Sequence, residues 1–82
     1  MMNKQYIYTK LNKIFSFVFD KDKFIVTEEM LNTNLEDWVD SLTRTSLISE
    51  VEDCFQIQFS MDEMLNIKTL KDIINIIEKY IS

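Results

Sequence analysis

The 82-residue sequence contains no histidine, no glycine and no proline, and it has a single cysteine. Without histidine, the chain lacks the usual general base of serine and cysteine hydrolases and the commonest nitrogen ligand for transition metals. Without glycine, it can build neither a P-loop nor a dinucleotide-binding loop, because both need backbone that approaches the ligand closely. We therefore expect a protein that is not an enzyme and that has no catalytic residues.

The sequence also lacks the marks of a membrane, secreted or calcium-binding protein. No apolar run approaches the ~20 residues of a membrane span, and residues 1–10 lack the apolar core and cleavage site of a signal peptide. Cys54 cannot form an internal disulfide, which agrees with a reducing compartment. Residues 20–22 faintly resemble the start of a calcium loop, but Ile25 and Leu31 replace its glycine and glutamate. We expect a soluble, cytoplasmic protein without a metal site.

Positive charge is scarce in the middle of the chain. The net charge is −5, yet residues 27–63 alone sum to −9, because ten carboxylates there accompany one cation, Arg44. Residues 1–26 sum to +3 and residues 64–82 to +1. Such a field repels nucleic acid and attracts basic partners. The acidic middle of the chain therefore predicts either a docking surface for a basic protein or a charged face that only contacts solvent. It also predicts that the protein has no nucleic-acid partner.

The apolar pattern predicts one all-α domain over residues 1–82. Apolar residues recur at helical spacing in three long segments, over residues 6–19, 41–55 and 70–81. A short helical turn is expected at 61–66, and the stretch before Asp40 predicts a long, partly packed loop with a local turn at 27–31. The predicted fold is a four-helix bundle of three long helices and one short helix before the last, with the long loop between the first two.

Glycine and proline are absent, so asparagine and aspartate are the residue types expected to form the turns of this chain. Both residue types tolerate left-handed backbone and form hydrogen bonds with their own backbone. The turn positions predicted on this basis are Asp20, Asp22, Asn32, Asn34 and Asn66. Asp40 is a favourable N-cap and predicts a helix that begins at Ser41.

The tripeptide Asp40-Ser41-Leu42 lies at this predicted helix start and is followed by a longer pattern without gaps. The pattern comprises an apolar and acidic helix ending at Phe55, the connection Gln56-Ile57-Gln58-Phe59, the acidic turn Met61-Asp62-Glu63-Met64, and Ile67-Lys68-Thr69-Leu70-Lys71-Asp72 opening the last helix. Over roughly residues 35–81 the chain resembles the acyl carrier proteins. It departs from that family at Trp38 and Val39, where a glycine is common, and at Ser46, where an acidic residue is common. A Trp placed like Trp38 is similar to that of some specialised stand-alone carriers.

The resemblance implies that Ser41 is the attachment site of 4′-phosphopantetheine and that Asp40 and Leu42 complete its motif. It implies a monomeric acyl carrier whose arm holds acyl groups as thioesters for fatty-acid, polyketide or other specialised biosynthesis. The implied partners are a phosphopantetheinyl transferase, a loading ligase, and synthases or transferases with basic patches. Two alternatives stay open: an aminoacyl or peptidyl carrier loaded by an adenylating ligase, and an unmodified acidic helical adaptor.

Elementary physical chemistry supports the same serine. A side chain in the first turn of a helix lies among unpaired backbone N–H groups at the positive end of the helix dipole, which favours an attached phosphodiester. Leu42 is predicted to lie on a polar face, opposite the buried stripe, as a recognition residue would. The partner contacts expected on the same helix are Leu42, Arg44, Glu50, Glu52 and Asp53.

Overall fold

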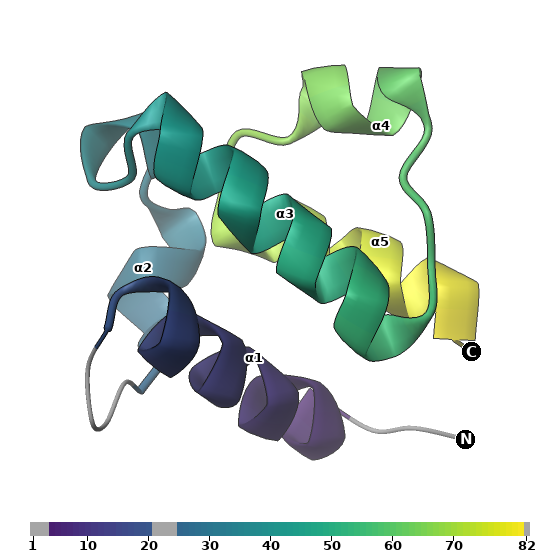
Figure 1. The fold of residues 1–82 in the computed structure, drawn as a ribbon, viewed down its shortest axis with the longest axis horizontal. Helices are drawn as coiled ribbons and strands as arrows, with labels where there is room; N and C mark the ends of the chain where they lie inside the picture. The colour runs from purple at the N-terminus through teal and green to yellow at the C-terminus, as the bar shows by residue number, and fades with distance from the viewer. Residues whose placement is uncertain (1–3, 21–24, 82) are drawn as a thin grey trace.

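The computed structural model describes residues 4–20 and 25–81, in which helices joined by short connections form the fold and no strand occurs (Figure 1). In chain order the elements are α1 (Lys4–Val18), α2 (Glu28–Asn32), the 3-10 helix η1 (Leu35–Asp37), α3 (Ser41–Phe55), α4 (Met61–Asn66) and α5 (Leu70–Ile81). The all-α prediction is confirmed, and α3, α4 and α5 have the predicted bounds. The long loop contains two short helices, of which α2 coincides with the local turn expected there. Asp22 and part of the rejected calcium loop lie outside the described residues.

The core is built from the inner faces of the three long helices, because each carries one apolar stripe. α1 packs against α3, and α2 packs against α5 (Figure 1). Connecting segments add Leu35, Val39, Phe59 and Ile67 to the core. The helices contribute Ile7, Leu11, Ile14 and Phe15 from α1, Leu47, Ile48, Val51 and Phe55 from α3, and Leu70, Ile73, Ile74 and Ile77 from α5. These stripes match the predicted helix faces.

The connection between α1 and α3 is packed along most of its described length. Leu35 is buried, and its N–H donates to the Lys68 carbonyl at 2.7 Å, which ties η1 to the α4–α5 connection. The Trp38 ring stacks on Phe19 at 6.1 Å and lies 5.9 Å from the Phe15 ring, between ring centroids. Buried Val39 follows directly. The start of α3 is thereby held in place by the core and not by a free loop.

Two described residues adopt left-handed backbone, Asp20 at φ 54° and Gln56 at φ 56°. The turn prediction for Asp20 is confirmed. Asn32 and Asn66 end α2 and α4, and their side chains donate to backbone carbonyls one turn earlier, while Asn34 directly precedes η1; none of the three has a positive φ. Gln56 is not among the predicted turn positions. Gln56 ends α3, and its N–H donates to the Glu52 carbonyl. A left-handed residue with a side chain costs roughly 1–2 kcal/mol relative to glycine.

Gln56→Gly is expected to raise the free energy of unfolding by about 0.5–1 kcal/mol, because glycine adopts this conformation without steric cost but gains entropy in the unfolded chain. Gln56→Val is expected to lower it by about 1 kcal/mol, because a β-branched side chain is strongly disfavoured at positive φ. Urea unfolding of the two variants beside the wild type measures both changes. Equal stabilities for the two variants would contradict the strain assigned to this position.

α4 contributes no fully buried residue: Met64 is partly buried against the core, and polar contacts hold the rest of the helix to the bundle. Its residue Glu63 accepts hydrogen bonds from the Ser60 N–H at 2.8 Å and the Tyr80 hydroxyl at 2.8 Å, and it forms an ion pair with Lys79 at 3.2 Å. The Ser60 amide, followed by the Tyr80 hydroxyl, lowers the pKa of Glu63 to about 2. The ionised carboxylate thus fastens α4 to its own N-cap and to α5.

Because the pKa of Glu63 is lower in the folded than in the unfolded chain, the ionised carboxylate raises the free energy of unfolding at pH values above its ordinary pKa of 4.5. This stabilisation is lost as the pH falls from there toward about 2. Thermal unfolding followed by circular dichroism at a series of pH values is expected to show a smaller acid destabilisation in Glu63→Gln than in the wild type. Parallel pH profiles for the two proteins would contradict this role.

Within residues 4–20 and 25–81 no helix is both long and apolar enough to cross a membrane.

Candidate functional site

Ser41 is the first residue of α3, and its side chain is exposed. The helix begins here because Asp40 caps it: the Asp40 carboxylate accepts the Thr43 N–H at 2.7 Å, and the Asp40 carbonyl accepts the Arg44 N–H at 2.8 Å. One residue earlier, buried Val39 anchors the chain in the core. An anchored residue and a capped helix therefore present the Ser41 hydroxyl to solvent at a fixed position.

The electrostatics at Ser41 differ from the expectation of several unpaired amides. The cap occupies the Thr43 N–H, and this hydrogen bond lowers the pKa of the Asp40 carboxyl below its ordinary value. An anion attached to Ser41 would share the helix N-terminus with this carboxylate. The Leu42 N–H also faces the Asp40 carboxylate, so what remains for an attached anion is the Ser41 N–H and the positive end of the dipole of a 15-residue helix.

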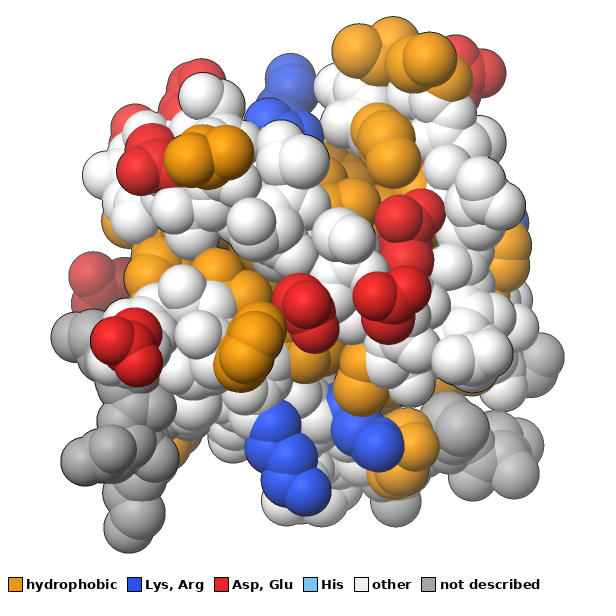
Figure 2. All heavy atoms as spheres, viewed as in Figure 1, with side chains coloured by type: hydrophobic (Ala, Val, Ile, Leu, Met, Phe, Trp, Pro, Cys, Tyr) orange, Lys and Arg blue, Asp and Glu red, His pale blue; other side chains and the backbone are white. Residues whose placement is uncertain are grey.

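Three of the five predicted partner-contacting residues lie on the outward surface of α3. Leu42 is 79% exposed, Asp53 is exposed, and Glu50 is half-buried on the adjoining edge. Leu42 and Asp53 are separated by three helical turns, with Ser46 and Ser49 between them, so they share one face. Figure 2 shows this side of the molecule, with a hydrophobic group near the start of α3 and carboxylates farther along the helix.

Glu52 has an internal structural contact that the sequence did not reveal. Its carboxylate accepts the Phe59 N–H at 2.8 Å, which fastens the α3–α4 connection back onto α3. Phe59 is buried, so this hydrogen bond also helps to hold a core side chain. A partner contact through Glu52 stays a prediction, but a substitution there would disturb the fold as well as the surface charge.

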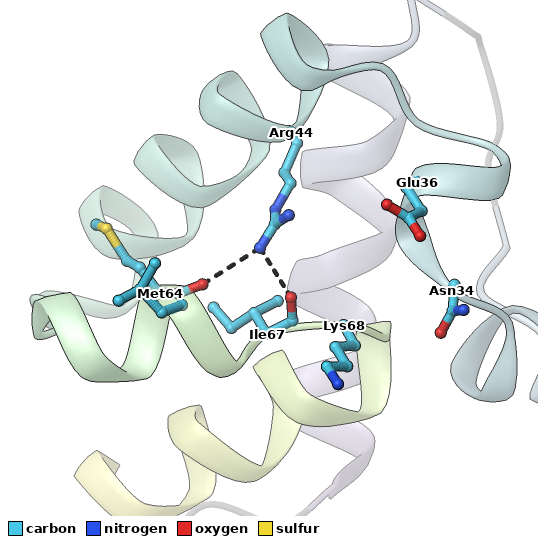
Figure 3. Close-up of a pocket in the computed structure, with 7 residues that line it drawn as sticks. Asn34, Glu36, Arg44, Met64, Ile67 and Lys68 are labelled. Atoms are coloured by element: carbon cyan, nitrogen blue, oxygen red, sulfur yellow. Dashed lines mark hydrogen bonds between the residues drawn. The ribbon is translucent and has the colours of Figure 1, made fainter.

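Arg44 also has a role inside the molecule (Figure 3). Its Nη2 donates to the carbonyl oxygens of Ile67 at 2.8 Å and Met64 at 3.3 Å. These carbonyls lie at the C-terminal end of α4, where the helix leaves acceptors unpaired and where a cation is favoured by the dipole. A cation in the first turn of its own helix is disfavoured by the dipole of that helix, but Arg44 stabilises the end of a neighbouring helix instead. Contact of Arg44 with a partner or with the arm stays a prediction.

Arg44→Met is expected to lower the free energy of unfolding by about 1–2 kcal/mol, since two carbonyls lose a charged donor on a half-buried surface. Amide hydrogen exchange in α4 should rise, because the apolar contact of this short helix with the core is limited to the partly buried Met64. Urea unfolding and residue-resolved exchange measure the two effects. Arg44→Lys, which keeps the charge and one donor, should lie between the wild type and Arg44→Met. If amide hydrogen exchange in α4 were as slow in Arg44→Met as in the wild type, the hydrogen bonds of Arg44 would not be what holds α4 in place.

Phe17 is an exposed surface residue that is not among the predicted site residues. It is 72% exposed on α1, outside the buried stripe of that helix, and it lines a surface hollow together with Leu42 and Glu50. Its position off the apolar stripe was visible in the sequence, but the hollow was not, because it forms between two helices that are far apart in the chain.

Comparisons with known proteins bear on the exposed serine at the start of α3. A family model described as "Phosphopantetheine attachment site" matches residues 25–77, which include Ser41 and most of the fold. A curated protein of Mycoplasmopsis pulmonis (strain UAB CTIP), named "Acyl carrier protein homolog", is 38% identical over 79 residues, which is 96% of each chain. This chain belongs to the acyl carrier protein family. No solved structure is significantly similar to it.

As in other acyl carrier proteins, the cofactor is 4′-phosphopantetheine, and proteins of this family are generally not catalysts themselves. The residues around Ser41 fit that group. The hydroxyl is exposed, the neighbouring Leu42 side chain points outward, and the helix dipole favours an attached anion. No group of three or more potential metal ligands occurs among the described residues.

Proposed function

We propose that Ser41 carries 4′-phosphopantetheine and that this chain transports acyl groups among partner enzymes of fatty-acid or specialised biosynthesis. When attached, the arm supplies a terminal thiol that holds an acyl group as a thioester. The observation that carries the proposal is the exposed Ser41 hydroxyl at the first position of α3, within the segment matched by the attachment-site family model. Acyl cargo is favoured over aminoacyl cargo by the name of the Mycoplasmopsis pulmonis relative.

The roles of the chain's own residues follow from their geometry. Asp40 starts α3 and fixes the position of Ser41, Ser41 provides the nucleophilic oxygen that receives the arm, and Leu42 offers an apolar contact beside it. Glu50 and Asp53 extend a negative surface along the same helix for basic partners. The whole of 1–82 acts as one monomeric, non-catalytic carrier domain in the cytoplasm.

The test is to incubate the purified protein with coenzyme A and a phosphopantetheinyl transferase and to record its intact mass. A gain equal to one phosphopantetheine group supports the proposal. An unchanged mass with several such transferases would instead support an unmodified adaptor for a basic partner. Assays of the modified protein with acyl-loading and with aminoacyl-adenylating ligases would then separate acyl from aminoacyl cargo.

A further inference from the structure

A hollow of about 340 Å³ lies between α2 and the segment that leads from η1 into α3. Its lining combines an aromatic ring and a thioether with a hydroxyl and two carboxylates, from Trp38, Met30, Thr33, Glu29 and Asp37. None of these described lining residues belongs to α3. The hollow is therefore separate from the outward face of that helix.

The Trp38 ring is held at the hollow by packing from inside the molecule. It stacks on Phe19 and lies tilted against Phe15. Its indole N–H is buried and donates to no acceptor among residues 4–20 and 25–81, so ring packing and not a hydrogen bond fixes its position. Because a glycine is common at this place in the family, the aromatic wall distinguishes this chain from the common family pattern.

The two carboxylates at the hollow have no partner in the described part of the chain. Glu29 and Asp37 are exposed, and neither side chain forms a hydrogen bond or an ion pair there. Residues 24–43 contain five carboxylates and no lysine or arginine. Exposed carboxylates by themselves are normal on a protein surface. Their position beside an aromatic wall makes this hollow different.

An organic cation complements both parts of the lining. Its charge is attracted by the carboxylates and by an aromatic ring, while the carbon atoms next to the charge can pack on Trp38 and on the adaptable Met30 side chain. A neutral apolar molecule would desolvate the carboxylates without compensation, and a small metal ion would leave the apolar walls in contact with water. We propose that this hollow binds an amine or a quaternary ammonium group on a short apolar stem. The inference goes beyond the proposed function and does not require modification of Ser41.

Two sources can supply such a group. One is a free amine, and the other is an amine-bearing acyl group on the arm of the same chain. Trp38 stands three residues before Ser41, so at most roughly 11 Å of chain separates them. A group tethered at Ser41 therefore starts close to the hollow.

The test is a titration of the unmodified full chain, in which butylammonium chloride replaces sodium chloride at constant ionic strength. Trp38 is the only tryptophan of the chain, so tryptophan fluorescence reports on this position alone. A saturable change with a Kd in the millimolar range is expected, because the contacts are few and partly exposed to solvent. Tetramethylammonium should give a similar change. Butanol, which has the same stem but no charge, should give no saturable change at the same concentrations.

Substitutions that remove one charge assign the binding to the hollow. Asp37→Asn and Glu29→Gln are each expected to raise the Kd for butylammonium about three- to fivefold, and the double variant should raise it at least about tenfold. Glu28→Gln is the matched control, because it removes the same charge from an exposed neighbour on α2 that does not line the hollow. Its Kd should equal that of the wild type. Circular dichroism verifies that each variant is folded.

Three results would overturn the inference: no saturable change with either cation, an equal response to butanol, or equal losses of affinity in Glu28→Gln and Asp37→Asn. None of them bears on the attachment of the arm to Ser41, because the titrated chain is unmodified. A second measurement, which rests on the proposed function, distinguishes the two sources once binding is found. The modified chain is loaded with an ω-aminohexanoyl or a hexanoyl group, and the nuclear magnetic resonance signal of the Trp38 indole N–H is recorded. A shift with the amine-bearing group alone assigns the hollow to tethered cargo, and equal signals assign it to a free amine.

Discussion

Ser41→Ala is expected to abolish phosphopantetheine attachment completely while leaving the fold intact. The substitution removes the only oxygen that we assign as the acceptor, and alanine is well tolerated in the first turn of a helix. The backbone contacts remain, since Asp40 still caps α3 and the Ser41 carbonyl still accepts the Thr45 hydroxyl at 3.0 Å. Intact mass after incubation with transferase and coenzyme A gives the result directly.

Ser46→Ala is the matched control for this substitution. Ser46 is another exposed serine on α3, more than one turn from the N-terminus, and it has no free first-turn amides beside it. The Ser46→Ala protein should gain the same mass as the wild type. Modification of Ser41→Ala, or loss of modification in Ser46→Ala, would assign the arm to a different residue.

Reversal of charge at two positions on α3 is expected to give the second large effect. In the double variant Glu50→Lys/Asp53→Lys, kcat/KM for transfer to Ser41 should fall at least about tenfold at low salt, because a basic partner then meets like charge on its docking surface. The deficit should shrink as salt rises, since the screening length falls from about 10 Å at 0.1 M to about 3 Å at 1 M. Glu52 is left out because its carboxylate holds Phe59.

The matched control carries the same change of net charge elsewhere. Glu29→Lys/Glu78→Lys places two cations on α2 and α5, at exposed and half-buried positions away from the outward face of α3. This variant should be modified at nearly the wild-type rate. Equal losses in the two double variants would show that overall charge governs the encounter and that α3 has no special docking role.

The helices were predictable because each buries one regular apolar stripe. Leu47, Ile48, Val51 and Phe55 recur at helical spacing and are all buried, and an aspartate suited to capping stands directly before Ser41. The bounds of α3 therefore followed from local rules alone. In the loop, Thr27 gave a partial signal for α2, whose N-terminus it caps through the Met30 N–H at 3.3 Å.

The contacts that tie distant segments together were not predictable from local rules. Arg44 lies three and four residues before Leu47 and Ile48, so the stripe indicates that its side chain points inward. Its two acceptors, at the end of α4 and at the residue that follows, are 20 and 23 residues away in the sequence. Glu52 reaches the Phe59 amide only because Gln56 turns the chain back through a left-handed conformation. The sequence predicts both residues as partner contacts, because it gives their charge and not their hydrogen-bonding partner.

The most direct measurement of the central claim is to locate the added group in the modified wild-type protein. Proteolysis followed by fragmentation of the modified peptide assigns the extra mass to a single residue. Fragment ions are expected to place one phosphopantetheine group on Ser41, next to Asp40 and Leu42. Placement on any other serine or threonine, or a modified protein whose Ser41 fragments keep their unmodified mass, would contradict the account.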